Sequence, residues 1–224
     1  MITGGPGDVP ALDAATVVLV RDGAAGLECL MLRKTSGQAF GGLWVFAGGR
    51  VEDGDGTGLD GARAAAVREA EEETGLVVDA GALVPFAHWT PPAEAPRRYN
   101  TWFFLAPLPA GAAEVVVDGS EIGDHVWTTP AMAQQRHRAG EIDLIPPTWV
   151  TLHRLTPFPD VASALAALGD DEVDYFSTVV AYVDGTMVML WHPDAGYATG
   201  DAGVPGNRHR LVMDRAGWRY ERSW

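Results

Sequence analysis

The sequence is short of cysteine, of basic residues and of long apolar stretches. Its single cysteine, Cys29, cannot form a disulfide within the chain, and its place in the apolar run 27–32 predicts a buried strand thiol. No unbroken apolar segment is long enough to cross a bilayer, and residues 1–12 lack the basic and then apolar pattern of a secretory signal. We therefore expect a cytoplasmic protein with no membrane segment.

Basic residues are outnumbered by acidic ones. The 224 residues include 16 Lys+Arg and 30 Asp+Glu, which gives a formal net charge of −14 at pH 7. A nucleic-acid binder needs a basic surface to neutralise phosphates, so this balance disfavours a nucleic-acid partner. The hydrophobic content of 47% is ordinary for a globular protein with a proper core and argues against disorder of most of the chain.

Strand and helix patterns alternate along most of the chain. Residues 1–13, rich in glycine, proline and aspartate, predict a flexible N-terminal arm. The apolar runs 16–20 and 27–32 flank a glycine-containing turn and predict a β-hairpin. Strands with helices between them predict a layered α/β or α+β domain over residues 14–156. The other strands expected are 43–46, 76–78, 83–89, 101–105, 115–117 and 125–128, and the helices are 60–74, 129–139 and 148–155.

The last third of the chain follows a Pro-Phe-Pro segment that marks a boundary. Residues 157–224 are expected to form an extension packed on the main domain. It would carry a helix over 161–168 and a hairpin made of strands 175–183 and 187–191. Its segment 208–222 holds five of the sixteen basic residues, a local reversal of the overall charge. A homodimer formed through this extension is a further expectation.

The helix expected over 60–74 is rich in alanine. Asp60 is placed as its N-cap and Gly75 as its C-cap glycine. At helical spacing, Glu71 points away from the other glutamates near the C-terminal end. The residues next to those glutamates would form the packing face, namely Ala66, Val67, Ala70 and Thr74.

Three glutamates, Glu69, Glu72 and Glu73, share one stripe of this helix at the spacing i, i+3 and i+4. Such like-charged neighbours weaken a helix, and carboxylates near its C-terminal end oppose the helix dipole. A divalent cation that prefers oxygen ligands, Mg²⁺ or Mn²⁺, would remove the conflict. Arg68, four residues before Glu72, can brace that carboxylate. From the cluster alone, a solvated acidic helix face is an equally good interpretation.

Residues 68–76, preceded by the Gly48-Gly49 loop, resemble the Nudix hydrolases. The box of that family is Gly, five residues, an acid, seven residues, then Arg-Glu-apolar-any-Glu-Glu-any-Gly-apolar. Residues 68–76 match every defined position of its second half, with Ala70 and Leu76 in the apolar places. The resemblance extends over residues 15–155 and implies an α/β/α sandwich with a mixed β-sheet, an α+β fold followed by the C-terminal extension.

The first half of the box admits two registers. In one, Gly54, Asp60 and Arg68 keep the family spacing, with aspartate in place of the usual glutamate. In the other, the loop that begins at Gly48-Gly49 takes the family position, Asp55 replaces the acid, and five extra residues precede Arg68. The second register is preferred because residues 44–49 look like the strand that leads into the loop, and the choice between Asp55 and Asp60 stays open.

The resemblance also implies roles for individual residues. Metal ions, Mg²⁺ or Mn²⁺, would be held by Glu69, Glu72 and Glu73, with Arg68 orienting Glu72. Glu121 looks like the family's extra acidic ligand or base from a loop outside the box, although an ordinary loop glutamate is an alternative. The base that takes a proton from water would be Glu69, Glu72 or Glu121.

Backbone and basic groups complete the expected site. Glycines let a backbone approach a phosphate or expose a carbonyl to a metal, so the Gly48 carbonyl is a candidate further ligand. Gly49 and Arg50 would then lie against the substrate. Arg97 and Arg98 either meet a phosphate from a loop beside the cleft or form a solvated turn.

Within the superfamily, softer signals resemble the peroxisomal-type coenzyme A diphosphatases and their bacterial relatives. They are the insertion inside the box and the strings at 88–92, 96–105 and 145–148. They imply hydrolysis of CoA or acyl-CoA to 3′-phospho-AMP and an (acyl-)4′-phosphopantetheine. The alternatives are a pyrophosphatase acting on NADH, ADP-ribose or a nucleoside triphosphate, and a nucleotide-sensing module without catalysis.

Overall fold

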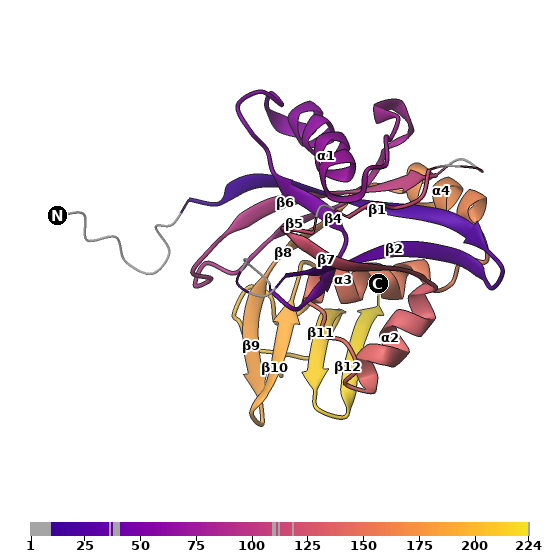
Figure 1. Cartoon of the computed structure of the whole chain (residues 1–224). Helices are drawn as coiled ribbons and strands as arrows, with labels where there is room; N and C mark the ends of the chain where they lie inside the picture. The colour runs from indigo at the N-terminus through magenta and orange to yellow at the C-terminus, as the bar shows by residue number, and fades with distance from the viewer. Residues whose placement is uncertain are drawn as a thin grey trace.

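A mixed β-sheet lies at the centre of the computed structural model, which describes residues 10–35, 37, 41–108, 111, 113–117 and 119–223 (Figure 1). Eight strands of these described residues belong to it. Their principal order is β3-β2-β1-β6-β5-β8, with β4 paired to β1 and β7 paired to β2. The strands are β1 (Leu12–Gly23), β2 (Gly26–Lys34), β3 (Trp44–Val45), β4 (Ala47–Arg50), β5 (Val84–Thr90), β6 (Tyr99–Pro107), β7 (Ile122–Thr128) and β8 (Asp174–Ser177).

The long strand β1 organises this sheet. One edge of it pairs with β6 in parallel from Leu12 to Val20. The other edge is divided between two antiparallel partners, with β4 opposite Ala14–Val17 and β2 opposite Val20–Gly23. The predicted hairpin of β1 and β2 is therefore confirmed. Because β1 already begins at Leu12, the end of the segment expected to be an arm lies in the sheet, and residues 1–9 fall outside the described part.

The two faces of β1 enter two separate cores. Val17 and Leu19 pack with the alanines of α1 (Gly58–Thr74), whereas Val18 and Val20 pack with residues of three other helices. This alternation is that of a strand buried on both faces. The expected α/β/α sandwich with a mixed sheet is confirmed, because α1 and the other three helices pack in separate cores. Those three helices are α2 (Pro130–Arg138), α3 (Pro146–Leu155) and α4 (Val161–Asp170). Figure 1 shows α1 on one side of the sheet and α2 and α3 on the other.

Helix ends follow the local sequence signals with small shifts. Thr129, where the second helix is expected to begin, is the N-cap of α2, and its side chain accepts a hydrogen bond from the Met132 N–H. The predicted cap Asp60 is wrong, because α1 begins earlier and Thr57 holds the N-cap position. Gly75 ends α1 in the left-handed conformation at φ 69°, which glycine adopts without a Cβ penalty.

Two predicted strands, 76–78 and 115–117, are wrong. Leu76 and Val78 are buried while Val77 is exposed, which is the alternation of a strand, but the segment pairs with no strand of the described chain. The backbone N–H of Val116 donates to the carbonyl of Thr74 instead. The second segment therefore lies against the C-terminal end of α1. The chain after α1 forms the short 3₁₀ helix η1 (Ala80–Ala82).

The C-terminal region contains a second, antiparallel sheet in the order β12-β11-β10-β9. The predicted single strand 175–183 is divided, because β8 joins the main sheet parallel to β5 and the next strand begins the second sheet. The hairpin of β11 and β12 was not predicted. Its bounds and those of its neighbours are β9 (Val179–Val183), β10 (Thr186–Leu190), β11 (Arg208–Asp214) and β12 (Gly217–Ser223).

Arginines of this hairpin have structural partners. Arg210 is buried and donates from two nitrogens to the two carboxylate oxygens of Asp194, each at 2.7 Å. Arg222 donates to both carboxylate oxygens of Asp174 on β8. Paired guanidinium groups can be buried between strands, so Arg210 and Arg222 of the basic segment 208–222 have structural roles in the C-terminal region.

Aromatic packing joins the two sheets. Phe176 of β8 is fully buried, stacks on Trp89 of β5 with ring centroids 3.9 Å apart, and meets Trp191 edge-on.

Replacing Phe176 with alanine leaves a cavity at this junction, so we expect the free energy of unfolding to fall by about 4 kcal/mol. Urea denaturation measures the loss. Tyr175→Ala is the matched control on an exposed neighbour, and an equal loss in both variants would contradict the assignment.

A buried histidine predicts a second, pH-dependent effect on stability. His209 is 2% exposed; its Nδ1–H donates to the His192 carbonyl at 2.8 Å, and its Nε2 accepts from the Tyr220 hydroxyl at 2.9 Å. This arrangement holds the ring neutral, and burial lowers its pKa from 6.5 to about 4.

Between pH 6.5 and 4 the unfolded chain therefore binds a proton that the folded chain excludes. The free energy of unfolding should decrease by about 3 kcal/mol as the pH falls through this window. Urea denaturation at several pH values measures how the free energy of unfolding depends on pH. His209→Phe should remove the decrease expected between pH 6.5 and 4. An unchanged decrease in that variant would show that His209 does not titrate in this way.

Candidate active site

The carboxylate-rich end of α1, the β4 loop and the proline-rich loop at 91–97 line one cleft of about 1050 Å³. Predicted residues from distant parts of the chain meet there. Arg98 is not among the lining residues. Every other predicted site residue lines the cleft, namely Gly48, Gly49, Arg50, Arg68, Glu69, Glu72, Glu73, Arg97 and Glu121.

The glycine pair of β4 permits close approach on both of its sides. A Cβ on Gly48 would lie 2.8 Å from the Thr16 Cα of β1, too close for two carbon atoms. A Cβ on Gly49 would overlap the carboxylate of Glu69. Glycine is thus required for β4 to pair with β1 while α1 presents its carboxylates to the strand.

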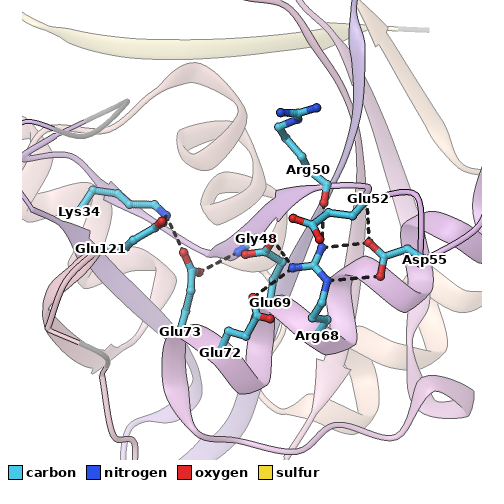
Figure 2. A network of polar contacts seen from close by, with 10 residues as sticks. All are labelled: Lys34, Gly48, Arg50, Glu52, Asp55, Arg68, Glu69, Glu72, Glu73 and Glu121. Carbon is cyan, nitrogen blue, oxygen red and sulfur yellow. Dashed lines mark hydrogen bonds and ion pairs between the residues drawn. The ribbon is translucent and has the colours of Figure 1, made fainter.

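Arg68 is the centre of one network in this cleft, shown in Figure 2. Its guanidinium donates to both carboxylate oxygens of Asp55, to Glu69 at 2.8 Å and to Glu72 at 3.1 Å. The predicted contact with Glu72 is present. Arg68 also donates to the carbonyl of Arg50 at 2.9 Å, which ties the loop to the helix.

The two candidate acids of the first half of the box have different surroundings. Asp55 accepts from Arg68 and from the Glu52 N–H, whereas Asp60 is exposed in the first turn of α1. The hydrogen bonds from Arg68 keep the pKa of Asp55 below its ordinary value. The structure thus brings Asp55, and not Asp60, into the network, in agreement with the register preferred from the sequence.

Lys34 is the centre of a second network and was missed from the sequence. Its ammonium lies 2.5 Å from Glu73 and 3.5 Å from Glu121, and the other Glu73 oxygen accepts from the Gly48 N–H at 3.0 Å (Figure 2). Glu121 is thereby placed at the cleft beside the box residues. The signal available in the sequence was that Lys34 is the only lysine of the chain and ends an apolar strand.

Burial controls the proton affinity of two helix glutamates. It raises the pKa of Glu69, and the neighbouring Arg68 offsets this only in part. It also raises the pKa of Glu73 despite the ion pair with Lys34 and the N–H of Gly48. A cation placed among these carboxylates would favour their ionised forms and reverse both shifts.

The donor set fits a hard divalent cation in its chemistry. Glu69, Glu72 and Glu73 supply carboxylate oxygens from one stripe of α1, as Mg²⁺ and Mn²⁺ prefer. Within the described residues, however, no three His, Cys, Asp or Glu side chains converge closely enough to hold an ion as they stand. Arg68 bonds one carboxylate oxygen each of Glu69 and Glu72, whereas the two oxygens of Glu73 accept from Lys34 and from the Gly48 N–H.

The remaining predicted contacts have mixed outcomes. The Arg50 side chain points away from the carboxylates in Figure 2, and Arg98 contributes its carbonyl to a hydrogen bond with the Leu12 N–H. Trp89, in the first of the strings noted for the coenzyme A branch, is 4% exposed and packs in the core. Each of the three strings noted for the coenzyme A branch contributes residues to the cleft, including Pro91, Arg97 and Pro146.

The two glycines of β4 face the end of α1 that carries the Arg-Glu-x-x-Glu-Glu pattern, and both line one cleft. This arrangement defines a Nudix-type site. The sequence model of the NUDIX domain matches residues 11–166 of the chain. The match covers more than half of the chain, so the chain belongs to the Nudix family.

Individual relatives are more distant. Acyl-coenzyme A diphosphatase NUDT19 of Gallus gallus is 28% identical over 155 residues, which are 64% of this chain and 41% of that protein. The NUDIX hydrolase of Alicyclobacillus acidocaldarius has a TM-score of 0.67 at 22% identity, over 74% of this chain and 100% of that one. The NUDIX domain of Shewanella oneidensis NrtR, solved with ADP ribose, has a TM-score of 0.52 at 16% identity, over 65% and 86%. At these identities the structures bear on the fold alone.

The ion pair between Lys34 and Glu73 predicts a stability effect. The side chains are 12% and 5% exposed, so Lys34→Met leaves a buried carboxylate without its counterion. We expect the free energy of unfolding to fall by about 3 kcal/mol in metal-free buffer. The double variant Lys34→Met/Glu73→Gln should recover at least half of that loss in urea denaturation. Additive losses in the double variant would show that the pair is not coupled.

Proposed function

We propose that the chain is a metal-dependent diphosphatase that hydrolyses the P–O–P linkage of a nucleoside diphosphate derivative. The supporting observation is that the Nudix box glutamates line one cleft together with Gly48, Lys34 and Glu121. An acidic protein can bind an anionic diphosphate at carboxylates only if cations neutralise the repulsion. The site therefore suits phosphoryl chemistry that depends on positioning and charge neutralisation.

Glu69, Glu72 and Glu73 would hold Mg²⁺ or Mn²⁺, with the Gly48 carbonyl as a further ligand. When bound, such ions polarise P–O bonds and lower the pKa of water. Arg68 holds Glu69 and Glu72 in place through its hydrogen bonds and is itself fixed by Asp55. Arg97, which lines the cleft, would meet a phosphate of the substrate.

A carboxylate takes the proton from the attacking water. Glu69, Glu72 and Glu121 all line the cleft. Glu121 comes from outside the helix and lies at the ammonium of Lys34, which orients it toward the box. The attack on phosphorus is followed by departure of a phosphate group, which carries its own charge.

The substrate proposed is coenzyme A or an acyl-CoA, with 3′-phospho-AMP and (acyl-)4′-phosphopantetheine as products. The name of the Gallus gallus relative and the apolar, proline-rich part of the cleft support it. NADH, ADP-ribose and nucleoside triphosphates are the alternative substrates. A nucleotide-sensing role without catalysis is the weaker alternative, since all three box glutamates are present.

Two further proposals concern the setting of the protein. We also propose that the protein is cytoplasmic and that it forms a homodimer through residues 157–224. No helix of the described residues is long and apolar enough to cross a membrane.

Glutamine substitutions test the site. Glu72 is exposed and Glu69 half-buried, so Glu72→Gln and Glu69→Gln should fold normally and lose kcat/KM by about a hundredfold. Glu71→Gln, on the opposite side of α1, is the matched control and should keep full activity. The measurement is product formation by mass spectrometry with Mg²⁺ or Mn²⁺ on CoA, acetyl-CoA, NADH, ADP-ribose and nucleoside triphosphates.

Each outcome of this panel has a distinct meaning. Full activity of both glutamine variants would make the metal assignment wrong. Turnover of NADH, ADP-ribose or a triphosphate without turnover of CoA would replace the substrate proposed. Nucleotide binding at saturating metal with no product from any substrate would establish the sensing module instead.

A further inference from the structure

One face of the β9–β10 hairpin carries four large side chains, Val180 and Tyr182 from β9 and Met187 and Met189 from β10. Val180 pairs with Met189, and Tyr182 pairs with Met187. Residues directly opposite on antiparallel strands point to the same side, so the four form one apolar face. On the other face of the hairpin, Ala181 and Val188 are buried in a different hydrophobic cluster.

The same face of the second sheet is covered where it continues onto β11 and β12. Leu211, which pairs with Met189, is fully buried in the main core. On β12, Trp218 and Tyr220 contact Trp149 and His153 of α3. Thus α3 covers the β11–β12 half, whereas the four side chains of the β9–β10 half lie along a hollow. Tyr182 remains 66% exposed.

That hollow continues from the active-site cleft. Met189 and Thr178 line the cleft itself. Val180, Tyr182 and Met187 line a neighbouring groove of about 490 Å³, which we call the side groove. The side groove shares Pro92, Ala95 and Thr178 with the cleft.

The wall between the two hollows is held rigidly. The Thr178 N–H donates to the Thr90 carbonyl at 3.0 Å, and the Trp191 indole donates to the Thr178 hydroxyl at 3.0 Å. These bonds fix the start of β9 against the end of β5. The side groove is thus a preformed continuation of the cleft, and its β9–β10 wall lies outside the residues matched by the family model.

The lining of the side groove selects an uncharged occupant. Glu94 is its one charged residue among those described, and a carboxylate disfavours a phosphate or a nucleotide. A diphosphate bound at the box glutamates has two substituents, so one of them can follow the apolar wall while the other carries the nucleoside. An arm of methylene groups gains affinity from each one buried.

We propose that the β9–β10 face binds the apolar arm on the non-nucleotide side of the diphosphate, with the acyl end of an acylated pantetheine in the side groove. The proposal rests on the function proposed above. It makes Tyr182 and Met187 specificity-determining residues and gives the C-terminal extension a role in substrate choice. Neither residue touches the box glutamates, so their replacement should leave the chemical step intact.

Charge insertion tests this assignment in the full chain. Tyr182→Asp and Met187→Asp place a carboxylate on the apolar wall, and Tyr175→Asp and Met132→Asp are matched controls at exposed positions away from both hollows. In both wall variants, the ratio of kcat/KM for octanoyl-CoA to that for CoA should fall about tenfold, mainly through KM. The controls should keep the ratio within twofold.

Binding of S-octanoyl-pantetheine, which has no nucleotide and no diphosphate, tests the groove without hydrolysis. Isothermal titration should show binding to the unmodified chain and to both controls, and at least a tenfold weaker affinity in the wall variants. No binding to the unmodified chain, or equal binding by all variants, would overturn the proposal even if CoA is hydrolysed.

The two proposals therefore fail separately. If the unmodified chain showed no diphosphatase activity, the proposed function would be wrong. The titration would still test whether the side groove binds S-octanoyl-pantetheine. A dimer that Tyr182→Asp converts to a monomer would show that a second copy of the chain covers this face, and would overturn the assignment to substrate. Unchanged octanoyl-CoA to CoA ratios in the wall variants would do the same.

Discussion

The crowding of carboxylates at the C-terminal end of α1 is the constraint on which the rest of the site depends. Glu69, Glu72 and Glu73 repel one another and oppose the helix dipole. Two basic side chains balance part of this charge, Arg68 from the same helix and Lys34 from β2. These pairs hold the glutamates at the cleft in positions from which a divalent ion can take over the same charge balance.

That balance requires the central sheet to bring the partners together. Lys34 ends β2, and Gly48 lies in β4, and both strands pair with β1. The absence of side chains at Gly48 and Gly49 lets β4 lie against β1 on one side and the Glu69 carboxylate on the other. The sheet edges and the helix end thus converge at one cleft. The C-terminal region adds to the lining of this cleft with Thr178, which lies between β8 and β9, and with Met189 of β10.

Local patterns predicted most elements and most of the site. The stripe of glutamates, the Gly75 cap and the start of the second helix at position 129 all depend on neighbours within a few residues, so the local sequence identified them. The segment 76–78 shows the limit of that reasoning, because its alternation is that of a strand but no partner strand lies beside it. The β11–β12 hairpin was not predicted, because its arginines are paired with Asp194 and Asp174, which lie at distant positions in the sequence.

The sequence by itself determined the class of the protein and the position of its carboxylates, because the box is a local pattern on a single helix. Only the tertiary structure decided that Asp55 meets Arg68, that Lys34 joins Glu73 to Glu121, and that β9 and β10 border the cleft. The contacts of Arg68 and Lys34 join residues from 13 to 87 positions apart. Pairing of distant charges and apolar faces depends on how strands are ordered in the sheet, which no local spacing encodes.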